Sequence, residues 1–190
     1  KKNYSIKISL KNNPYEVLVG RNIIKKCKNK IFSTIKSAKK IFIITDTTIK
    51  RLHLKKIIQI IPKNIFVKTL AISTGEKMKD INTINKISTF LLKNKISRND
   101  AIFALGGGVI GDLSGFLASI TLRGINLVHF PTTLLAQVDS SIGGKTGVNS
   151  SYGKNLIGSF YQPNLVVCDT IFLTTLPSRE LIAGYAEVIK

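Results

Sequence analysis

This sequence of 190 residues has only two cysteines, no tryptophan and few acidic side chains. Cys27 and Cys168 provide neither a disulfide framework nor a CxxC metal pair, which favours a reducing compartment. The longest unbroken apolar run, residues 101–105, is far shorter than the roughly 20 residues that span a bilayer. The first twenty residues lack the apolar core of a signal peptide. We therefore expect a soluble, cytoplasmic protein without a membrane segment.

The shortage of acidic residues gives a strong positive charge, with 10 Asp and Glu against 29 Lys and Arg. Such an excess is typical of nucleic-acid-binding proteins. Here it is confined to residues 1–100, which hold 24 basic and 5 acidic side chains (24 − 5 = +19), whereas residues 101–190 hold five of each. The lysines are scattered, without an arginine cluster or interleaved aromatic residues. We interpret them as a solvated surface and keep a basic nucleic-acid-binding module as an alternative, which salt-dependent filter binding would test.

Glycine has the opposite distribution, because 12 of the 14 glycines follow residue 105. Glycine is favoured where the backbone turns sharply or approaches a ligand closely. The first half therefore resembles a scaffold and the second half a site. The chain begins with Lys and ends inside a helical pattern, so we expect a fragment of a longer protein.

Short apolar strands alternate with amphipathic helices along the chain, which predicts a parallel α/β sheet with ligands at the carboxyl ends of the strands. We expect an N-terminal β-hairpin of residues 4–10 and 15–19, and further strands at 41–45, 65–71, 101–105, 125–130 and 165–168. Helices are expected at about 48–61 and 78–94, and a third is opened by the segment GGGVIGDLSG and ends at about 121. The fold class is a Rossmann-like α/β domain over residues 1–173. Residues 174–190 begin a second, truncated all-α domain.

The segment GGGVIG at residues 106–111 satisfies the GxGxxG pattern between a strand and a helix, where N–H groups can receive a pyrophosphate. An ordinary site of this kind also has an acidic residue about 20 positions later for the ribose. Here the next acidic residue that far along the chain is Asp139, which lies in another motif, whereas Asp46 lies upstream at the end of an earlier strand. The segment is therefore either a glycine-rich turn with only a packing role, or part of a nucleotide-binding fold in which the binding elements follow one another in a different order along the chain.

The segment SSIGGKTG at residues 140–147 is not a P-loop, because Asp139 occupies a required glycine position and residues 134–139 are predicted to be helical. Residues 143–158 are predicted to form a long glycine-rich loop, and such loops are commonly functional. Its cations Lys145 and Lys154, together with Arg123, suggest a phosphorylated substrate; a merely solvated loop is the alternative.

Metal-binding signals are sparse. Glu187 and Lys190 are spaced i, i+3 and share a helix face, which also fits a surface ion pair. His53 and His129 have no ligand spacing with Glu187, so this chain alone does not complete a metal site.

Taken together, four segments closely resemble the 3-dehydroquinate synthase family: GGGVIGDLSGF, LRGINLVHFPTTLLAQVDSSIGGKTGVN, GKNLIGSFYQPNLVVCD and TLPSRELIAGYAEVIK. The resemblance extends over the whole chain and corresponds to roughly the N-terminal half of that family. It implies an NAD-dependent, zinc- or cobalt-dependent lyase of the shikimate pathway, which makes aromatic amino acids. The family converts 3-deoxy-D-arabino-heptulosonate 7-phosphate into 3-dehydroquinate and phosphate, with NAD reduced and regenerated in each cycle.

The resemblance also assigns roles by position. The implied NAD contacts are Asp46, Thr48, Thr74, Gly75, Glu76, Lys77, Met78, Lys79, Gly108, Val109, Ile110, Gly111, Asp112, Thr132, Thr133, Lys145, Lys154, Phe172, Leu173, Thr174 and Thr175. The implied catalytic and substrate-binding residues are Arg123, Asp139, Lys145, Asn155 and Lys190. Arg123 resembles the phosphate-binding arginine that reaches across a homodimer, and Glu187 resembles one metal ligand. The other two metal ligands of the family lie beyond residue 190, so we expect residues 1–190 alone to be inactive.

Two enzyme alternatives remain within the same superfamily. Another sugar phosphate cyclase, such as an aminodehydroquinate or valiolone-type synthase, differs in a few pocket residues. A glycerol-dehydrogenase-like metal-dependent alcohol dehydrogenase shares the architecture but has no need of the cationic residues 143–158.

Overall fold

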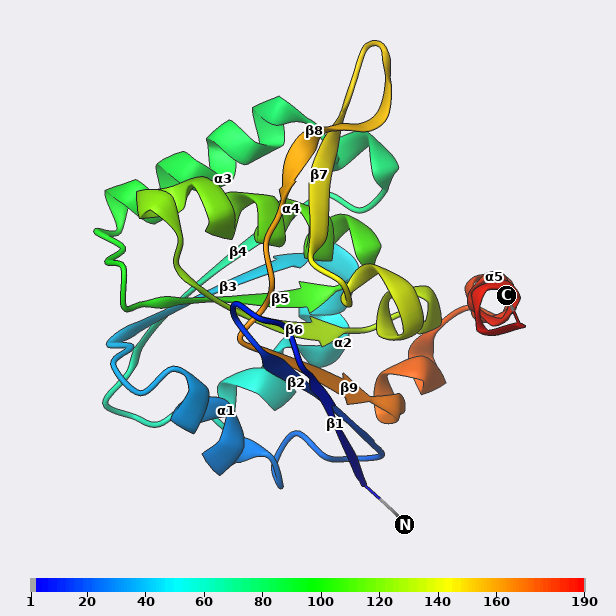
Figure 1. Cartoon of the computed structure of the whole chain (residues 1–190), viewed down its shortest axis with the longest axis horizontal. Coiled ribbons are helices and arrows are strands. Elements are labelled where there is room, and N and C mark those ends of the chain that lie inside the picture. Colours follow the sequence, from blue (N-terminus) through cyan, green and yellow to red (C-terminus); the bar gives the residue numbers. More distant parts are fainter. Residues whose placement is uncertain (1–2, 190) are drawn as a thin grey trace.

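The computed structural model describes residues 3–189, which form one seven-stranded sheet in the order β1-β2-β9-β6-β5-β3-β4 (Figure 1). β1 pairs antiparallel with β2, and all the other neighbours are parallel. The predicted hairpin and parallel sheet are therefore confirmed. The strands of this sheet are β1 (Tyr4–Ile8), β2 (Tyr15–Gly20), β3 (Lys40–Asp46), β4 (Phe66–Ile72), β5 (Ala101–Gly106), β6 (Asn126–Pro131) and β9 (Leu165–Asp169).

The helices begin where the sequence offers capping residues. Asp46 and Asp80 accept hydrogen bonds from the N–H groups of Ile49 and Thr83 at 2.9 and 2.7 Å, and so begin α2 and α3. None of the helices within residues 3–189 is both long and apolar enough to cross a membrane. The α-helices are α1 (Lys28–Thr34), α2 (Thr47–Ile58), α3 (Ile81–Lys93), α4 (Gly108–Ile120) and α5 (Ser178–Ile189).

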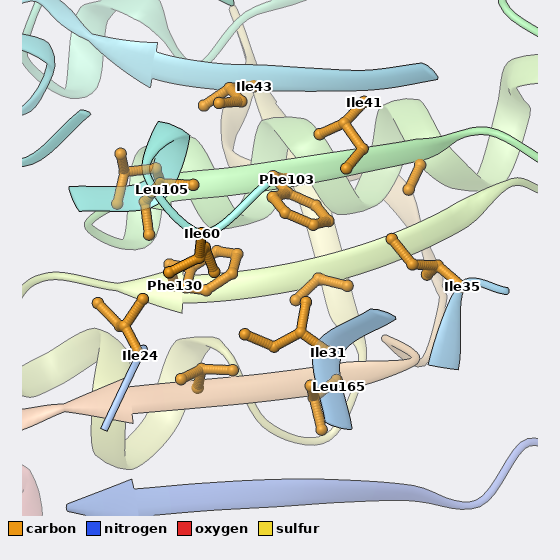
Figure 2. Close-up of a cluster of buried hydrophobic side chains, with 14 of the residues drawn as sticks. Ile24, Ile31, Ile35, Ile41, Ile43, Ile60, Phe103, Leu105, Phe130 and Leu165 are labelled. Atoms are coloured by element: carbon orange, nitrogen blue, oxygen red, sulfur yellow. The ribbon is translucent and has the colours of Figure 1, made fainter. Parts of the chain in front are cut away.

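The central strands of the sheet are buried on both faces, as their near-continuous apolar runs require. Ile41 and Ile43 of β3 join a cluster with α1 and α2 on one face, and Figure 2 shows this cluster over β3, β5, β6 and β9. Phe42 and Ile44 point the other way, into a cluster with α3 and α4. The molecule is thus a three-layer α/β fold, which confirms the predicted fold class.

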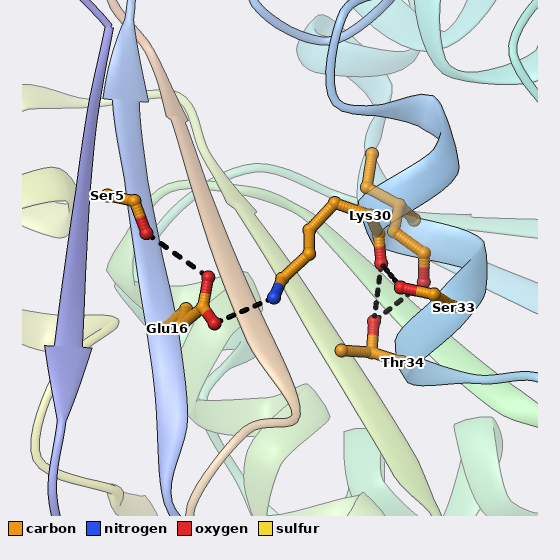
Figure 3. A network of polar contacts seen from close by, with 6 residues as sticks. Ser5, Glu16, Lys30, Ser33 and Thr34 are labelled. Atoms are coloured by element: carbon orange, nitrogen blue, oxygen red, sulfur yellow. Dashed lines mark hydrogen bonds and ion pairs between the residues drawn. The ribbon is translucent and has the colours of Figure 1, made fainter.

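A polar contact fastens the N-terminal hairpin to α1 (Figure 3). The Glu16 carboxylate accepts hydrogen bonds from Lys30 Nζ at 2.7 Å and from Ser5 Oγ at 3.1 Å. The hydrogen bond from Lys30 lowers the pKa of Glu16. Because the Lys30 side chain is 41% exposed, an ion pair of this kind contributes at most about 1 kcal/mol.

Residues 143–158 differ from the sequence-based prediction. Instead of an irregular loop, they form most of an antiparallel hairpin, which consists of β7 (Lys145–Ser150) and β8 (Gly153–Phe160). This hairpin packs on α4. The strands approach so closely that a Cβ on Gly158 would lie 2.0 Å from the Thr146 carbonyl oxygen. The glycines that suggested a loop are therefore what permits these two strands to pair.

The segment before this hairpin is η3 (Ala136–Ser140), a π-helix preceded by two α-helical residues. The prediction of a helix over 134–139 is therefore correct in position, and the structure refines its type. π-Helical turns are rare in proteins, and those that occur are often found at functional sites. η3 and α5 lie beyond the carboxyl ends of β5 and β6 (Figure 1).

Candidate functional site

The order of the parallel strands creates a crevice between β3 and β5. The helix that follows β3, α2, covers one face of the sheet, whereas the helix that follows β5, α4, covers the other. Connections that leave in opposite directions open a ligand-binding crevice at the carboxyl ends of their strands. A cavity of about 650 Å³ lies at this point; we call it the crevice.

Most of the predicted cofactor contacts line the crevice. They come from the ends of β3, β4, β5 and β6, from η1 (Glu76–Met78) and from η4 (Thr170–Thr175). They are Asp46, Thr48, Thr74, Gly75, Glu76, Lys79, Gly108, Val109, Ile110, Asp112, Thr132, Thr133 and Thr175. Their proposed contacts with a cofactor stay a prediction, but the fold does bring these residues together.

The glycine-rich turn presents bare backbone to the crevice. Gly107 caps α4 without any side-chain hydrogen bond, and the first turn of α4 carries no acidic residue. A Cβ on Gly107 would lie 3.0 Å from Thr133 Cγ2, and one on Gly108 would lie 3.2 Å from Ser140 Oγ. The unpaired N–H groups at such a helix start can bind an anion.

Two side-chain oxygens in the crevice wall, Thr132 Oγ1 and Ser140 Oγ, lack a hydrogen-bond partner within the described residues. Thr132 is 2% exposed, and its Oγ1 makes no hydrogen bond, although its N–H donates to the Gly106 carbonyl oxygen at 2.9 Å. An unsatisfied buried hydroxyl costs about 1–3 kcal/mol. A ligand with polar groups would recover this energy.

Asp46 has a structural task in addition to its predicted contact with ribose. One carboxylate oxygen, Oδ1, caps α2 by accepting from Ile49 N. Asp46 also lines the crevice, so the same carboxylate is available at the ligand side. Its replacement would therefore change both the stability of α2 and the crevice.

A buried ion pair forms part of the crevice wall. Lys79 Nζ contacts Asp112 Oδ2, and the two side chains are 7% and 16% exposed. Burial raises the pKa of Asp112, Lys79 lowers it, and the carboxylates of Glu76 and Asp139 raise it further. Lys79 is thus a single cation among three carboxylates.

A second cavity of about 450 Å³, here called the adjoining cavity, lies between η3 and the β7–β8 hairpin. It brings together three residues predicted to contact substrate, Asp139, Lys145 and Asn155. Asp112 and Ser140 line both cavities, so the two cavities share a wall at the start of α4. Two ligands bound in these cavities would lie next to each other.

Several other predicted contacts line neither cavity: Lys77, Met78, Gly111, Lys154, Phe172, Leu173 and Thr174. Packing explains three of these positions. Phe172 is fully buried in the hydrophobic core, and the partly buried Met78 packs against the core, so neither side chain lines a cavity. Gly111 faces the ring of His129, where a Cβ would lie 3.7 Å away.

Arg123 also lies away from both cavities, in the turn η2 (Thr121–Arg123) between α4 and β6. Glu187 is in α5, and Lys190 lies outside the described residues. The histidines are buried apart from each other: His53 Nε2 lies 2.8 Å from Thr175 Oγ1, and burial lowers the pKa of His129 to about 4. No three His, Cys, Asp or Glu side chains within residues 3–189 are placed to hold a metal ion.

Sequence reasoning missed several residues at the site, among them Ser140, Glu180 and Gln137. Ser140 lines both cavities, Glu180 of α5 lines the crevice, and Gln137, a residue of η3, is 7% exposed. Gln137 Nε2 donates to the carbonyl oxygens of Pro131 and Asp169, at 3.1 and 3.3 Å. It thereby anchors η3 to the ends of β6 and β9. Ser140 and Gln137 lie inside the specific motif PTTLLAQVDSSIGGKT, which was the available signal.

Comparison with known proteins agrees with this geometry. The family described as 3-dehydroquinate synthase N-terminal matches residues 69–183. The 3-dehydroquinate synthase of Pelagibacter ubique is 44% identical over 97% of the chain, and the chain covers 50% of that protein. The chain thus spans about half the length of the curated relatives it matches.

Two solved structures of sugar phosphate cyclases are similar to this fold. A 2-deoxy-scyllo-inosose synthase, complexed with carbaglucose-6-phosphate, NAD+ and Co2+, is 28% identical with a TM-score of 0.90; the match covers 98% of this chain and 50% of that one. The 2-epi-5-epi-valiolone synthase of Streptomyces hygroscopicus, with NAD+ and Zn2+ bound, is 27% identical with a TM-score of 0.80; here the match covers 94% and 49%.

Proposed function

Because the chain belongs to the 3-dehydroquinate synthase family, we propose that the protein is a lyase that converts 3-deoxy-D-arabino-heptulosonate 7-phosphate into 3-dehydroquinate and phosphate. The observation that carries this proposal is the family match over residues 69–183, which include most of both cavities. A cavity suited to a nucleotide adjoins one that holds a lysine, an aspartate and an asparagine.

The crevice fits NAD by its own chemistry. The uncapped start of α4 suits the pyrophosphate, Asp46 suits a ribose hydroxyl pair, and Thr132 Oγ1 offers an unused hydrogen bond. When bound, NAD would supply a reversible hydride acceptor, so that phosphate elimination can proceed from an oxidised ring. The bound NAD+ in both cyclase structures supports this assignment.

The adjoining cavity would hold the phosphorylated substrate. Lys145 offers a cation, and Asp139 and Asn155 offer polar groups to ring hydroxyls. In this proposal Asp139 would accept a hydrogen bond from a ring hydroxyl, and Lys145 would offset the charge of the phosphate. Asp112, held by Lys79, would keep the wall between the two ligands rigid.

The divalent metal expected for this family is not accommodated by residues 3–189 alone. Glu187 would contribute one ligand, whereas a catalytic zinc normally takes three protein ligands. The other ligands would come from the part of the protein that follows residue 190, as the family resemblance implies. In this proposal residues 1–173 are the NAD-binding domain and 174–190 begin a helical metal and substrate domain.

The protein is further proposed to be a cytoplasmic homodimer, in which Arg123 binds the substrate phosphate of the partner. The position of Arg123 beyond the C-terminal end of α4, away from both cavities of its own chain, supports a role in trans. Mixed dimers of Arg123→Ala and Asn155→Ala subunits should then regain activity, whereas an arginine that works within its own subunit gives no complementation.

Phosphate release by the full-length protein tests the function. We expect release that requires NAD without net accumulation of NADH, and Lys145→Ala should lower kcat/KM by about a hundredfold. The matched control is Lys86→Ala, which replaces a different exposed lysine, located on α3, and should retain the activity. Net NADH formation from glycerol would instead identify an alcohol dehydrogenase. Normal turnover by Lys145→Ala would remove that residue from the site.

A second candidate is another sugar phosphate cyclase, because the 2-deoxy-scyllo-inosose synthase matches 98% of the chain with a TM-score of 0.90. Release of phosphate from other phosphorylated sugars, in preference to the heptulosonate phosphate, would favour it.

A further inference from the structure

Asn149 lies at an irregularity in the β7–β8 hairpin. The pairing register shifts between Val148 and Ser150, so Asn149 has no partner in the ladder. Its N–H instead donates to the carbonyl oxygen of Lys79 at 2.8 Å. Bulges of this kind often redirect a side chain beside a functional site.

The redirected side chain connects two segments that line different cavities. Asn149 Nδ2 donates to Glu76 Oε1 at 2.8 Å, and Asn149 Oδ1 accepts from the N–H of Asn155 at 3.0 Å. Glu76 lines the crevice, whereas Asn155 lines the adjoining cavity. Asn155 has a φ of 58°, a left-handed conformation that its hydrogen bond to Asn149 stabilises.

The hairpin does not need Asn149 in order to stay on the body of the protein. Thr146 packs against Gly115 of α4, and Ser159 Oγ donates a hydrogen bond to Ser119 Oγ at 2.7 Å. These contacts already fix β7 and β8 to α4. The three hydrogen bonds of Asn149 therefore have a more specific effect, which is to set Glu76 and Asn155 relative to each other.

We propose that Asn149 is a positioning residue that couples the crevice to the adjoining cavity. An NAD molecule that contacts Glu76 fixes this carboxylate, Asn149 transmits the constraint, and the backbone at Asn155 becomes ordered for the second ligand. The proposal rests on the proposed function, because it takes NAD as the ligand of the crevice.

Hydrogen exchange of the full-length protein, with and without NAD, tests the coupling. In the wild type, NAD should slow exchange both at the turn 106–112 and in the hairpin at 150–158. Asn149→Asp replaces the donor to Glu76 with a carboxylate, so the two side chains repel. In this variant NAD should slow exchange at 106–112 and leave 150–158 unchanged. Asn82→Ala, at an exposed position of α3, is the matched control and should behave as the wild type.

A second variant separates positioning from a general loss of structure. In Glu76→Gln/Asn149→Asp the donor and acceptor exchange places, so the hydrogen bond re-forms and the effect of NAD on 150–158 should return. Asn149→Asp should also weaken NAD binding by about three- to tenfold, as expected for one lost hydrogen bond. Equal slowing of 150–158 in the wild type and Asn149→Asp, or no return in the double variant, overturns the coupling. No slowing at 106–112 in the wild type overturns the proposed NAD site, and the coupling with it.

Discussion

Removal of Lys79 should destabilise the protein strongly, because it would leave the carboxylate of Asp112 buried without a counterion. The Asp112 side chain is 16% exposed and that of Lys79 is 7% exposed. Breaking a buried pair by removing one partner costs about 3 kcal/mol or more. For a chain of this length that corresponds to a fall in Tm of roughly 6–12 °C. Lys79→Met keeps most of the apolar stem of the side chain and removes its charged ammonium group.

The pH dependence of this variant follows from the pKa of Asp112. Burial already raises that pKa, and Lys79 opposes the rise. Without Lys79 the pKa rises further, so the folded form binds a proton more tightly than the unfolded chain does. The lost stability should therefore return as pH falls through the raised pKa toward the ordinary value of about 3.9. Above the raised pKa the full loss remains.

The assay is thermal unfolding without NAD at several pH values. Lys77→Met is the matched control, since Lys77 is exposed and lines neither cavity, and it should change the free energy of unfolding by less than about 0.5 kcal/mol. Lys79→Met/Asp112→Asn should recover much of the loss at neutral pH. If Lys79→Met is as stable as the control, or if its stability falls further in acid, the reasoning about a buried pair is wrong.

Two further predictions concern single residues. Asp46→Ala should weaken NAD binding in calorimetry and lower the free energy of unfolding by about 1 kcal/mol, because the cap of α2 is lost. Asp46→Asn keeps the cap and should weaken only the binding of NAD. Unchanged NAD affinity in both variants would exclude Asp46 from the site. Burial lowers the pKa of His129 to about 4, so the unfolded chain binds a proton more readily below the ordinary value of about 6.5, and stability should fall as pH decreases through this range. When the pH is lowered from 7 to 5, the free energy of unfolding, measured with urea, should fall by about 2 kcal/mol less in His129→Leu than in the wild type. An equal fall in both proteins would show that His129 is not responsible.

The order of strands and helices could be predicted because each buried strand carries its own signal. Residues 41–45 and 101–105 are apolar on both faces, and polar or glycine-rich segments follow them. The hairpin of β7 and β8 could not be recognised in this way. Its two strands are rich in glycine and polar residues, and their pairing depends on close approach at Gly147 and Gly158 and on packing against α4.

The site was predicted best where the backbone itself forms it. The glycine turn at 106–111 and the residues after β3 and β6 follow from their place at strand ends. Side-chain roles were harder to predict, since neighbours in the sequence face opposite ways. Phe172 resembles a cofactor contact by position, yet its ring fills the core. Asn149 has no distinctive spacing, because its side-chain hydrogen bond to Glu76 joins residues 73 positions apart.

The charge of the crevice differs from that of the whole chain, and this difference bears on how a dinucleotide would be held. The chain carries a formal charge of +19, but the crevice is lined by four acidic residues and one lysine: Asp46, Glu76, Asp112, Glu180 and Lys79. Lys79 is already paired with Asp112. Side-chain cations of the crevice therefore do not offset the two charges of a pyrophosphate, and the N–H groups at the start of α4 must do so. This explains why the turn needs glycine, and why an acidic crevice would not attract a polyanion even though the surface is basic.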